Sequence, residues 1–210
     1  MKNLTVKIHN ILDNNPAIQH CLCMNLINMR ALARSIKNTE NINASMDAII
    51  SVLRRYKPYC SIKENEHKKL FSDFSILIKH GVAVISLYDN AFEQVAKDFL
   101  RDQVLRSNIR LIKTKEYFKI IISEKNFDEK IAVFKKDDIK DVKRNITEFR
   151  LIFSSDITPN KGIFAKITSQ LSMHDVNIVD VFACTPEILV YVEEINALKA
   201  HQALLDLKKA

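Results

Sequence analysis

Glycine occurs only twice in these 210 residues, at positions 81 and 162, whereas ordinary usage of roughly 7% would give about 15. Phosphate-binding and dinucleotide-binding loops need several glycines in one short segment, as does the nucleophile elbow of serine hydrolases. The sequence therefore excludes these kinds of site. Gly162 lies where a predicted strand passes into a predicted helix, in the segment Thr158-Pro159-Asn160-Lys161-Gly162-Ile163. This segment is the best candidate for a binding site.

The composition predicts a folded cytoplasmic protein. Hydrophobic residues make up 47% of the chain, which is enough for a core. The apolar runs are far shorter than the roughly 20 residues that span a membrane, and the N-terminus does not resemble a signal peptide. The four cysteines suit a reducing compartment. In His20-Cys21-Leu22-Cys23, a helix would point the two cysteines about 200° apart, so we expect neither a metal site nor a cofactor.

Charge divides the chain into a basic head and a mildly acidic tail. Residues 1–58 hold eight Lys or Arg and three Asp or Glu, a net +5, whereas residues 146–210 carry a net −2. Such an asymmetry raises the question of nucleic-acid binding by the head.

The first 58 residues predict an all-helical module. Asn15 and Pro16 are typical of a helix start, as the N-cap and the first helical residue. Apolar spacing predicts helices before Asn15 and at about residues 17–24, 26–36 and 43–56, the last ended by Pro58. The polar residues 59–71 are predicted to be a connector.

From residue 72 onward, strands and helices alternate in two similar runs. The first run, 72–145, predicts strands at 74–78 and 82–87 joined by a turn at His80-Gly81, and a helix from Asn90 to about 105. It continues with strands at 109–114 and 117–123 and a helix at 126–134. The second run, 146–210, predicts a strand at 149–154, a helix at 162–173, strands at 176–182 and 188–192, and a last helix capped by Asn196. The offset of about 70 residues indicates an internal repeat of ferredoxin-like units. The predicted fold class is α+β: an all-helical N-terminal module and two βαββαβ repeats.

The second repeat resembles the ACT domain, a small ligand-sensing module. The resemblance rests on Leu151-Ile152-Phe153, the loop before Gly162, the helix that follows, Val176-Asn177-Ile178-Val179-Asp180 and the strand at 188–192. The tandem arrangement is similar to the regulatory region of aspartokinases, and the helical head is similar to that of uncharacterised archaeal ACT-domain proteins. The resemblance implies an amino-acid effector and a homodimer formed through the ACT-like domains. The sequence departs from the ACT pattern in two ways: the turn at 159–162 is longer, and the second repeat has no fourth strand of its own. We expect the strand at 74–78, or one from a partner chain, to fill that edge.

Chemistry at the Gly162 turn supports a ligand site. A glycine there tolerates positive φ, and free N–H groups at the helix start bind a carboxylate. Asn177 and Ile178 offer an amide and backbone groups to an α-amino group. The predicted ligand-binding residues are Asp156, Asn160, Gly162, Asn177 and Ile178. The alternative is that Gly162 is only a turn residue and Asn177 only a strand-start cap. The first repeat has Tyr88-Asp89-Asn90 at this turn, without glycine, and is expected to be a structural mate.

Two basic clusters in the head predict phosphate contacts. Arg30, Arg34 and Lys37 share one helical stripe, and Arg54, Arg55 and Lys57 gather at a helix end, as in helix-turn-helix proteins that bind DNA. The alternative is a solvated face, with cations favoured by the helix dipole, on a dimerisation or docking module. The histidines are scattered, so we expect no enzyme activity. The predicted function is a non-catalytic regulator that binds a small metabolite, and contact of the head with DNA would make it a ligand-responsive transcription regulator. The alternative is a ligand-independent dimeric interaction or scaffold protein.

Overall fold

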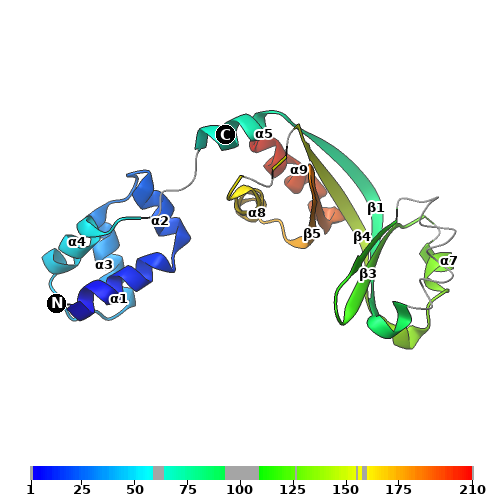
Figure 1. The fold of residues 1–210 in the computed structure, drawn as a ribbon, viewed down its shortest axis with the longest axis horizontal. Helices are drawn as coiled ribbons and strands as arrows, with labels where there is room; N and C mark the ends of the chain where they lie inside the picture. Colours follow the sequence, from blue (N-terminus) through cyan, green and yellow to red (C-terminus); the bar gives the residue numbers. More distant parts are fainter. Residues whose placement is uncertain are drawn as a thin grey trace. The chain divides into compact units, whose positions relative to one another are not determined.

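The chain folds into two compact units, Met1–Ile62 and Lys63–Ala210 (Figure 1). The computed structural model describes residues 2–58, 64–92, 109–125, 127–154, 156–157 and 160–209. Each unit has its own hydrophobic core, so each is described by itself.

The N-terminal unit is helical, as the sequence predicts. Its helices are α1 (Lys2–Asp13), α2 (Pro16–Cys23), α3 (Met29–Thr39) and α4 (Met46–Arg55). The Asn15 side chain accepts a hydrogen bond from the Ile18 N–H at 3.1 Å, which confirms the predicted cap of α2. The other two starts were predicted slightly too early, because Asn28 caps α3 and Ser45 caps α4. Apolar residues of α1, α3 and α4 form one core, in which Ile8 and Ile49 are fully buried.

The cysteines correct one expectation. Cys21 and Cys184 are free thiols, as predicted for a reduced protein. Cys23, however, is disulfide-bonded, so the expectation of reduced cysteines does not hold for this residue.

The C-terminal unit is built on one antiparallel sheet of six strands in the order β2-β3-β1-β4-β6-β5. The strands are β1 (Phe74–Tyr88), β2 (Arg110–Lys113), β3 (Tyr117–Ser123), β4 (Ile139–Phe153), β5 (Ile178–Cys184) and β6 (Glu187–Glu193). The α-helices are α5 (Glu64–Ser72), α7 (Phe127–Ile131), α8 (Ile163–Met173) and α9 (Ala197–Asp206), with short 3-10 turns η1 (Asp89–Ala91), η2 (Lys136–Asp138) and η3 (Glu194–Asn196). Helix α5 occupies much of the segment predicted to be a connector. Asn196 is the N-cap residue of α9, as predicted, although its side chain makes no capping hydrogen bond.

Strands β1 and β4 are 15 residues long, and each serves both halves of the sheet (Figure 1). Residues 82–88 of β1 pair with β3, whereas residues 74–79 pair with residues 148–153 of β4. The first part of β4 pairs with β1, and its second part also pairs with β6. The first half therefore contains β2, β3, the end of β1 and the start of β4. The second half contains β5, β6, the end of β4 and the start of β1. The predicted filling of the open edge by residues 74–78 is confirmed within the chain.

The internal repeat itself stays a prediction. The described strands of the two halves occur in matching order, but most of the helix expected at residues 90–105 lies outside the described residues. The capping box of Asn90 with Glu93 and the helix start at Asn126 also lie there in part.

The predicted turn at His80-Gly81 is wrong, because β1 continues through it. Gly81 has φ of 65° and lies where the pairing register of β1 and β4 shifts, between Lys79 and Val82. Asn145 of β4 has φ of 53° beside the next register shift. Each long strand thus carries a β-bulge with a left-handed residue where it passes from one half to the other. A bulge adds one residue and bends the strand without reversing it.

Alternating side chains give the sheet two apolar faces. On one face, β4 and β6 pack against α8 and α9, and β1 and β3 pack against α7. The other face buries a third cluster made only of strand residues: Val82, Val84, Ile121, Ile146, Leu189 and Tyr191. Partly buried Ile112 of edge strand β2 and Phe182 of edge strand β5 pack against the same cluster. The sheet therefore curls, so that its two edges approach one another over this face.

Candidate functional site

The loop before α8 has the geometry expected of a binding turn. Gly162 occupies the N-cap of α8 with φ of 84° and, being glycine, brings no side chain of its own to cap the helix. The helix is anchored on its inner side, where Ile163 and Ile167 are buried. The start of α8 therefore offers the N–H groups and the positive end of the helix dipole to an anion.

Two further predicted residues lie in the same loop. Asp156 is exposed, and the Asn160 N–H donates to the Ile157 carbonyl oxygen at 3.0 Å. Ile157 is buried in the core beneath α8. The structure thus groups Asp156, Asn160 and Gly162 on one anchored loop.

Asn177 and Ile178 lie at the end of β6 opposite to the end that is next to the Gly162 loop. Ile178 pairs with Val192 of β6, and Asn177 is the exposed residue before it. The loop that holds Gly162 follows the end of β4. There, Ile152 pairs with Glu187, the first residue of β6. Helix α8 spans the separation, and its 11 residues extend over about 16 Å. One site holding all five predicted residues therefore requires a second copy of the chain.

The corresponding turn of the first half is filled by its own side chains. Lys113 forms an ion pair with Asp89 and lies 4.6 Å from the centroid of the Phe92 ring. Asn90 donates from Nδ2 to Asp138 Oδ1 at 3.1 Å. Internal contacts thus occupy the described part of this turn, and its role as a structural mate stays a prediction.

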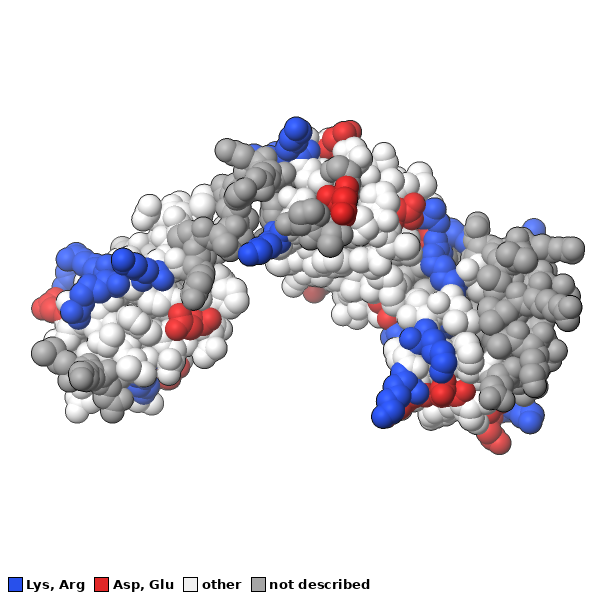
Figure 2. Space-filling view, viewed as in Figure 1, with Lys and Arg blue, Asp and Glu red and all other residues white. Residues whose placement is uncertain are grey.

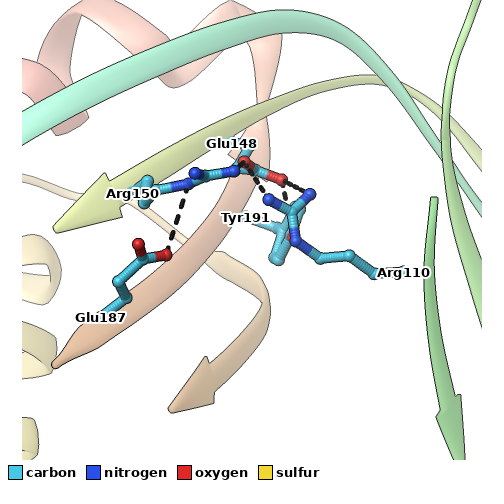
Figure 3. A network of polar contacts seen from close by, with 5 residues as sticks. All are labelled: Arg110, Glu148, Arg150, Glu187 and Tyr191. Atoms are coloured by element: carbon cyan, nitrogen blue, oxygen red, sulfur yellow. Dashed lines mark hydrogen bonds and ion pairs between the residues drawn. The ribbon is translucent and has the colours of Figure 1, made fainter. Parts of the chain in front are cut away.

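A buried polar network, which the sequence did not predict, connects the two halves of the sheet (Figure 3). Glu148 of β4 is only 2% exposed. Arg110 of β2 donates to it from both terminal nitrogens, at 2.5 and 2.9 Å, and the Tyr191 hydroxyl donates at 2.8 Å. Burial, followed by the Glu148 charge, raises the pKa of Tyr191, so this phenol remains a hydrogen-bond donor.

Three further ion pairs lie on these strands. Arg150 lies 3.7 Å from Glu148 and 3.6 Å from Glu187 (Figure 3). Lys119 of β3 reaches Asp180 of β5 at 2.5 Å, and the second Asp180 oxygen is buried with no hydrogen-bond partner among the described residues. Charge-assisted bonds of this kind are strong and directional. The arrangement is suited to holding β2 and β3 against β4, β5 and β6. In the sequence, the only local sign of this network is that charged residues occupy the alternate positions 148 and 150 of an otherwise apolar strand.

The predicted basic residues lie on the surface of the N-terminal unit, where Figure 2 shows Lys and Arg gathered on one face. Arg30, Arg34, Arg54, Arg55 and Lys57 are exposed and Lys37 is half-buried. Arg55 donates from Nε to the Ser51 carbonyl oxygen at 3.1 Å. On α3, this stripe is opposite the buried Leu32, Ala33 and Ile36.

Two other kinds of site were sought in the described parts of the chain. Those parts hold no group of His, Cys, Asp or Glu side chains that could bind a metal ion. Within the same ranges, every helix is too short or too polar to cross a membrane.

No protein-family model and no curated protein matches the chain, but about two thirds of the chain is similar in fold to regulatory regions of aspartate kinases. Aspartate kinase from Synechocystis matches 67% of this chain and 27% of its own, at 14% identity and a TM-score of 0.55. The ligand-free regulatory subunit of aspartate kinase from Thermus thermophilus matches 63% of this chain and 95% of its own, at 11% identity and a TM-score of 0.51. Clostridium acetobutylicum aspartate kinase, an allosteric enzyme, matches at 17% identity and a TM-score of 0.50, and the chain spans about a third of its length (34%). The C-terminal unit is therefore ACT-like in fold.

Proposed function

We propose that the C-terminal unit senses an amino acid, whose carboxylate binds at the start of α8. The observation that carries the proposal is Gly162, the exposed N-cap of α8, which has φ of 84° and brings no side chain of its own to cap the first turn. Asp156 and Asn160 lie on the same loop and supply polar groups for the rest of the ligand. The ACT-like fold supports this role, because solved structures of this fold include the regulatory subunit of an aspartate kinase.

The complete site would form between two copies of the chain. Because Asn177 and Ile178 lie at the far end of β6 from the loop, they would contact the ligand from a partner's unit. The protein would then be a homodimer whose ligand stabilises one arrangement of the two units.

The N-terminal unit would be the output module of a non-catalytic regulator. The exposed stripe of α3, with Arg30, Arg34 and Lys37, supports contacts to DNA phosphates. Arg54, Arg55 and Lys57 at the end of α4 would add to the same contact. The protein would be a ligand-responsive transcription regulator.

Thermal unfolding of the full chain with each of the common amino acids tests the sensing proposal. A ligand at 100 times its Kd stabilises the folded protein by about 2.7 kcal/mol. Asn160→Ala and Asn177→Ala should each weaken this shift, whereas Asn90→Ala, on the corresponding turn of the first half, should leave it unchanged. If no amino acid shifts the transition, a ligand-independent dimeric interaction protein becomes the better description.

Duplex DNA binding at several salt concentrations tests the output module. Each phosphate contact should contribute about −0.9 to the slope of log affinity against log salt concentration. Arg34→Ala combined with Arg54→Ala should reduce the slope, while the matched control Lys199→Ala in the other unit should not. Binding that does not respond to salt, or no binding, would leave the head as a protein-docking module.

A further inference from the structure

An open pocket of about 430 Å³ lies at the end of β6 away from the Gly162 loop. Residues 143–146 of β4 form one wall, and residues 193–195, at the end of β6 and in η3, form the other. Ile146 pairs with Glu193 across the two strands. The pocket therefore sits at the bulge of β4, and its volume falls in the range of small-molecule sites.

The β4 wall is held in place from outside the pocket. Glu124 Oε1 accepts from Arg144 Nε and from the Asn145 N–H, each at 3.0 Å. Arg144 also lies over the Phe127 ring at 4.5 Å. These contacts hold the left-handed backbone at Asn145 and pair the charge of Arg144 with Glu124. Lys143 is therefore the cation on this wall that is left to bind a ligand.

The opposite wall offers a carboxylate. Glu194 lies 3.8 Å from His80 Nδ1, and that histidine nitrogen is 3.0 Å from Thr147 Oγ1. Glu193 is exposed. Among the residues that the structure describes, no side chain forms an ion pair with Glu193 or Lys143. Two uncommitted charges of opposite sign therefore line the two walls of one pocket.

The apolar residues of the pocket add a third element. Ile146 and Ile195 both line the pocket; Ile146 is buried, whereas Ile195 is 87% exposed. A simple anion would be repelled by the glutamate wall, and a simple cation by the lysine wall. We propose that this pocket binds a small zwitterion with an apolar substituent, its carboxylate on Lys143 and its ammonium group on Glu193. The site is separate from the Gly162 loop and does not depend on it.

NMR of the full chain with isotope-labelled amides tests the proposal directly. The probe is an equimolar mixture of L-leucine, L-isoleucine, L-valine and L-methionine, with 4-methylpentanoate and 3-methylbutylamine as matched ligands that carry only one of the two charges. The mixture should shift the amide signals of residues 143–146 and 193–195, and neither single-charge ligand should do so. Absence of these shifts, or equal shifts with a single-charge ligand, would overturn the proposal.

Charge variants identify the two walls. Lys143→Glu and Glu193→Lys should each weaken binding at least about tenfold, because each loses one charge-assisted contact. The combined charge swap should restore binding, since the walls again carry opposite charges. Lys199→Glu, at a lysine that does not line the pocket, is the control. Tighter binding by Glu193→Lys would instead show a simple anion site.

The same spectra separate this proposal from the sensing proposal. Shifts confined to residues 160–166 would support sensing at the Gly162 loop and overturn the pocket proposal. Shifts confined to the pocket would support the pocket proposal and leave the sensing proposal to the thermal-unfolding test with all common amino acids.

Discussion

The two halves of the C-terminal sheet differ most where their long strands end. In the first half, the turn after β1 is closed by its own side chains, with Lys113 on Asp89 and Asn90 on Asp138. In the second half, the loop after β4 leads to Gly162, an N-cap residue that has no side chain of its own to cap α8. A turn whose partners are internal is already satisfied, whereas a helix start without a cap leaves N–H groups for another acceptor. The comparison indicates that any amino-acid binding at these turns belongs to the second half.

The halves are nevertheless not independent bodies. Each takes part of a long strand from the other, and the Arg110–Glu148 contact joins β2 of the first half to β4 within the second. The following predictions, from the largest expected effect to the smallest, test how far the halves differ and how tightly they are joined.

Arg110→Ala should lower the free energy of unfolding by about 3 kcal/mol, because it leaves the buried Glu148 carboxylate without its main partner. Urea denaturation followed by circular dichroism measures the change. Lys113→Ala is the matched control, because its ion pair is partly exposed, with side chains 39% and 43% accessible, and such pairs contribute about 0–1 kcal/mol. Equal effects of the two variants would mean that the network does not join the halves.

Gly81→Ala should destabilise the unit by about 1–2 kcal/mol, the cost of a left-handed conformation for a residue with a side chain. An added Cβ would meet no atom within 4 Å, so the cost arises in the backbone alone. Asn145→Gly, at the bulge of the other long strand, is the control and should not be destabilising in this way. The same denaturation experiment applies, and a neutral Gly81→Ala would show that the bulge of β1 relaxes easily.

Tyr191→Phe should cost about 1 kcal/mol at neutral pH, through loss of the hydrogen bond to Glu148. Because the pKa of Tyr191 is raised in the folded state, an unfolded chain ionises this phenol first, at a pH of about 10. The folded state then loses relative stability as the pH rises further. The stability difference between wild type and variant should therefore shrink above about pH 10. A constant difference across the alkaline range would contradict the buried position of this hydroxyl.

Asp89→Ala should change stability by less than about 1 kcal/mol, since its ion pair with Lys113 is partly exposed. It should also create no amino-acid binding at the first-half turn, as measured by thermal unfolding with the same amino acids. Asp137→Ala, at an exposed position in η2, controls for loss of surface charge. A new ligand response would show that the two turns differ only in what fills them.

Local elements were predictable because their signals lie within a few residues. Strand β3 has the predicted bounds of 117–123, and α8 lies within the predicted 162–173. The cap at Asn15 follows from side-chain chemistry that acts over three residues. The loop at Gly162 belongs to the same group, since a strand-to-helix turn is a local event.

Errors arose where a local signal has two meanings. A glycine with positive φ serves a turn or a bulge equally well, so Gly81 was assigned to a turn although β1 continues through it. The first ten residues of β4 were missed because charged side chains, among them Lys140 and Lys143, interrupt the apolar alternation. Pairing with β1 makes this segment a strand despite its composition.

What the sequence by itself determined is the type and order of most elements and the single glycine-led helix start in the second half. These depend on backbone preferences and apolar spacing, which act along the chain. Only the tertiary structure decided that two long strands serve both halves, and that Arg110 and Tyr191 meet Glu148 across separations of 38 and 43 residues. It also placed the Gly162 loop and Asn177 at opposite ends of β6. Such contacts depend on which strands pair and in which register, and pairing between distant segments leaves no periodic trace in either segment alone.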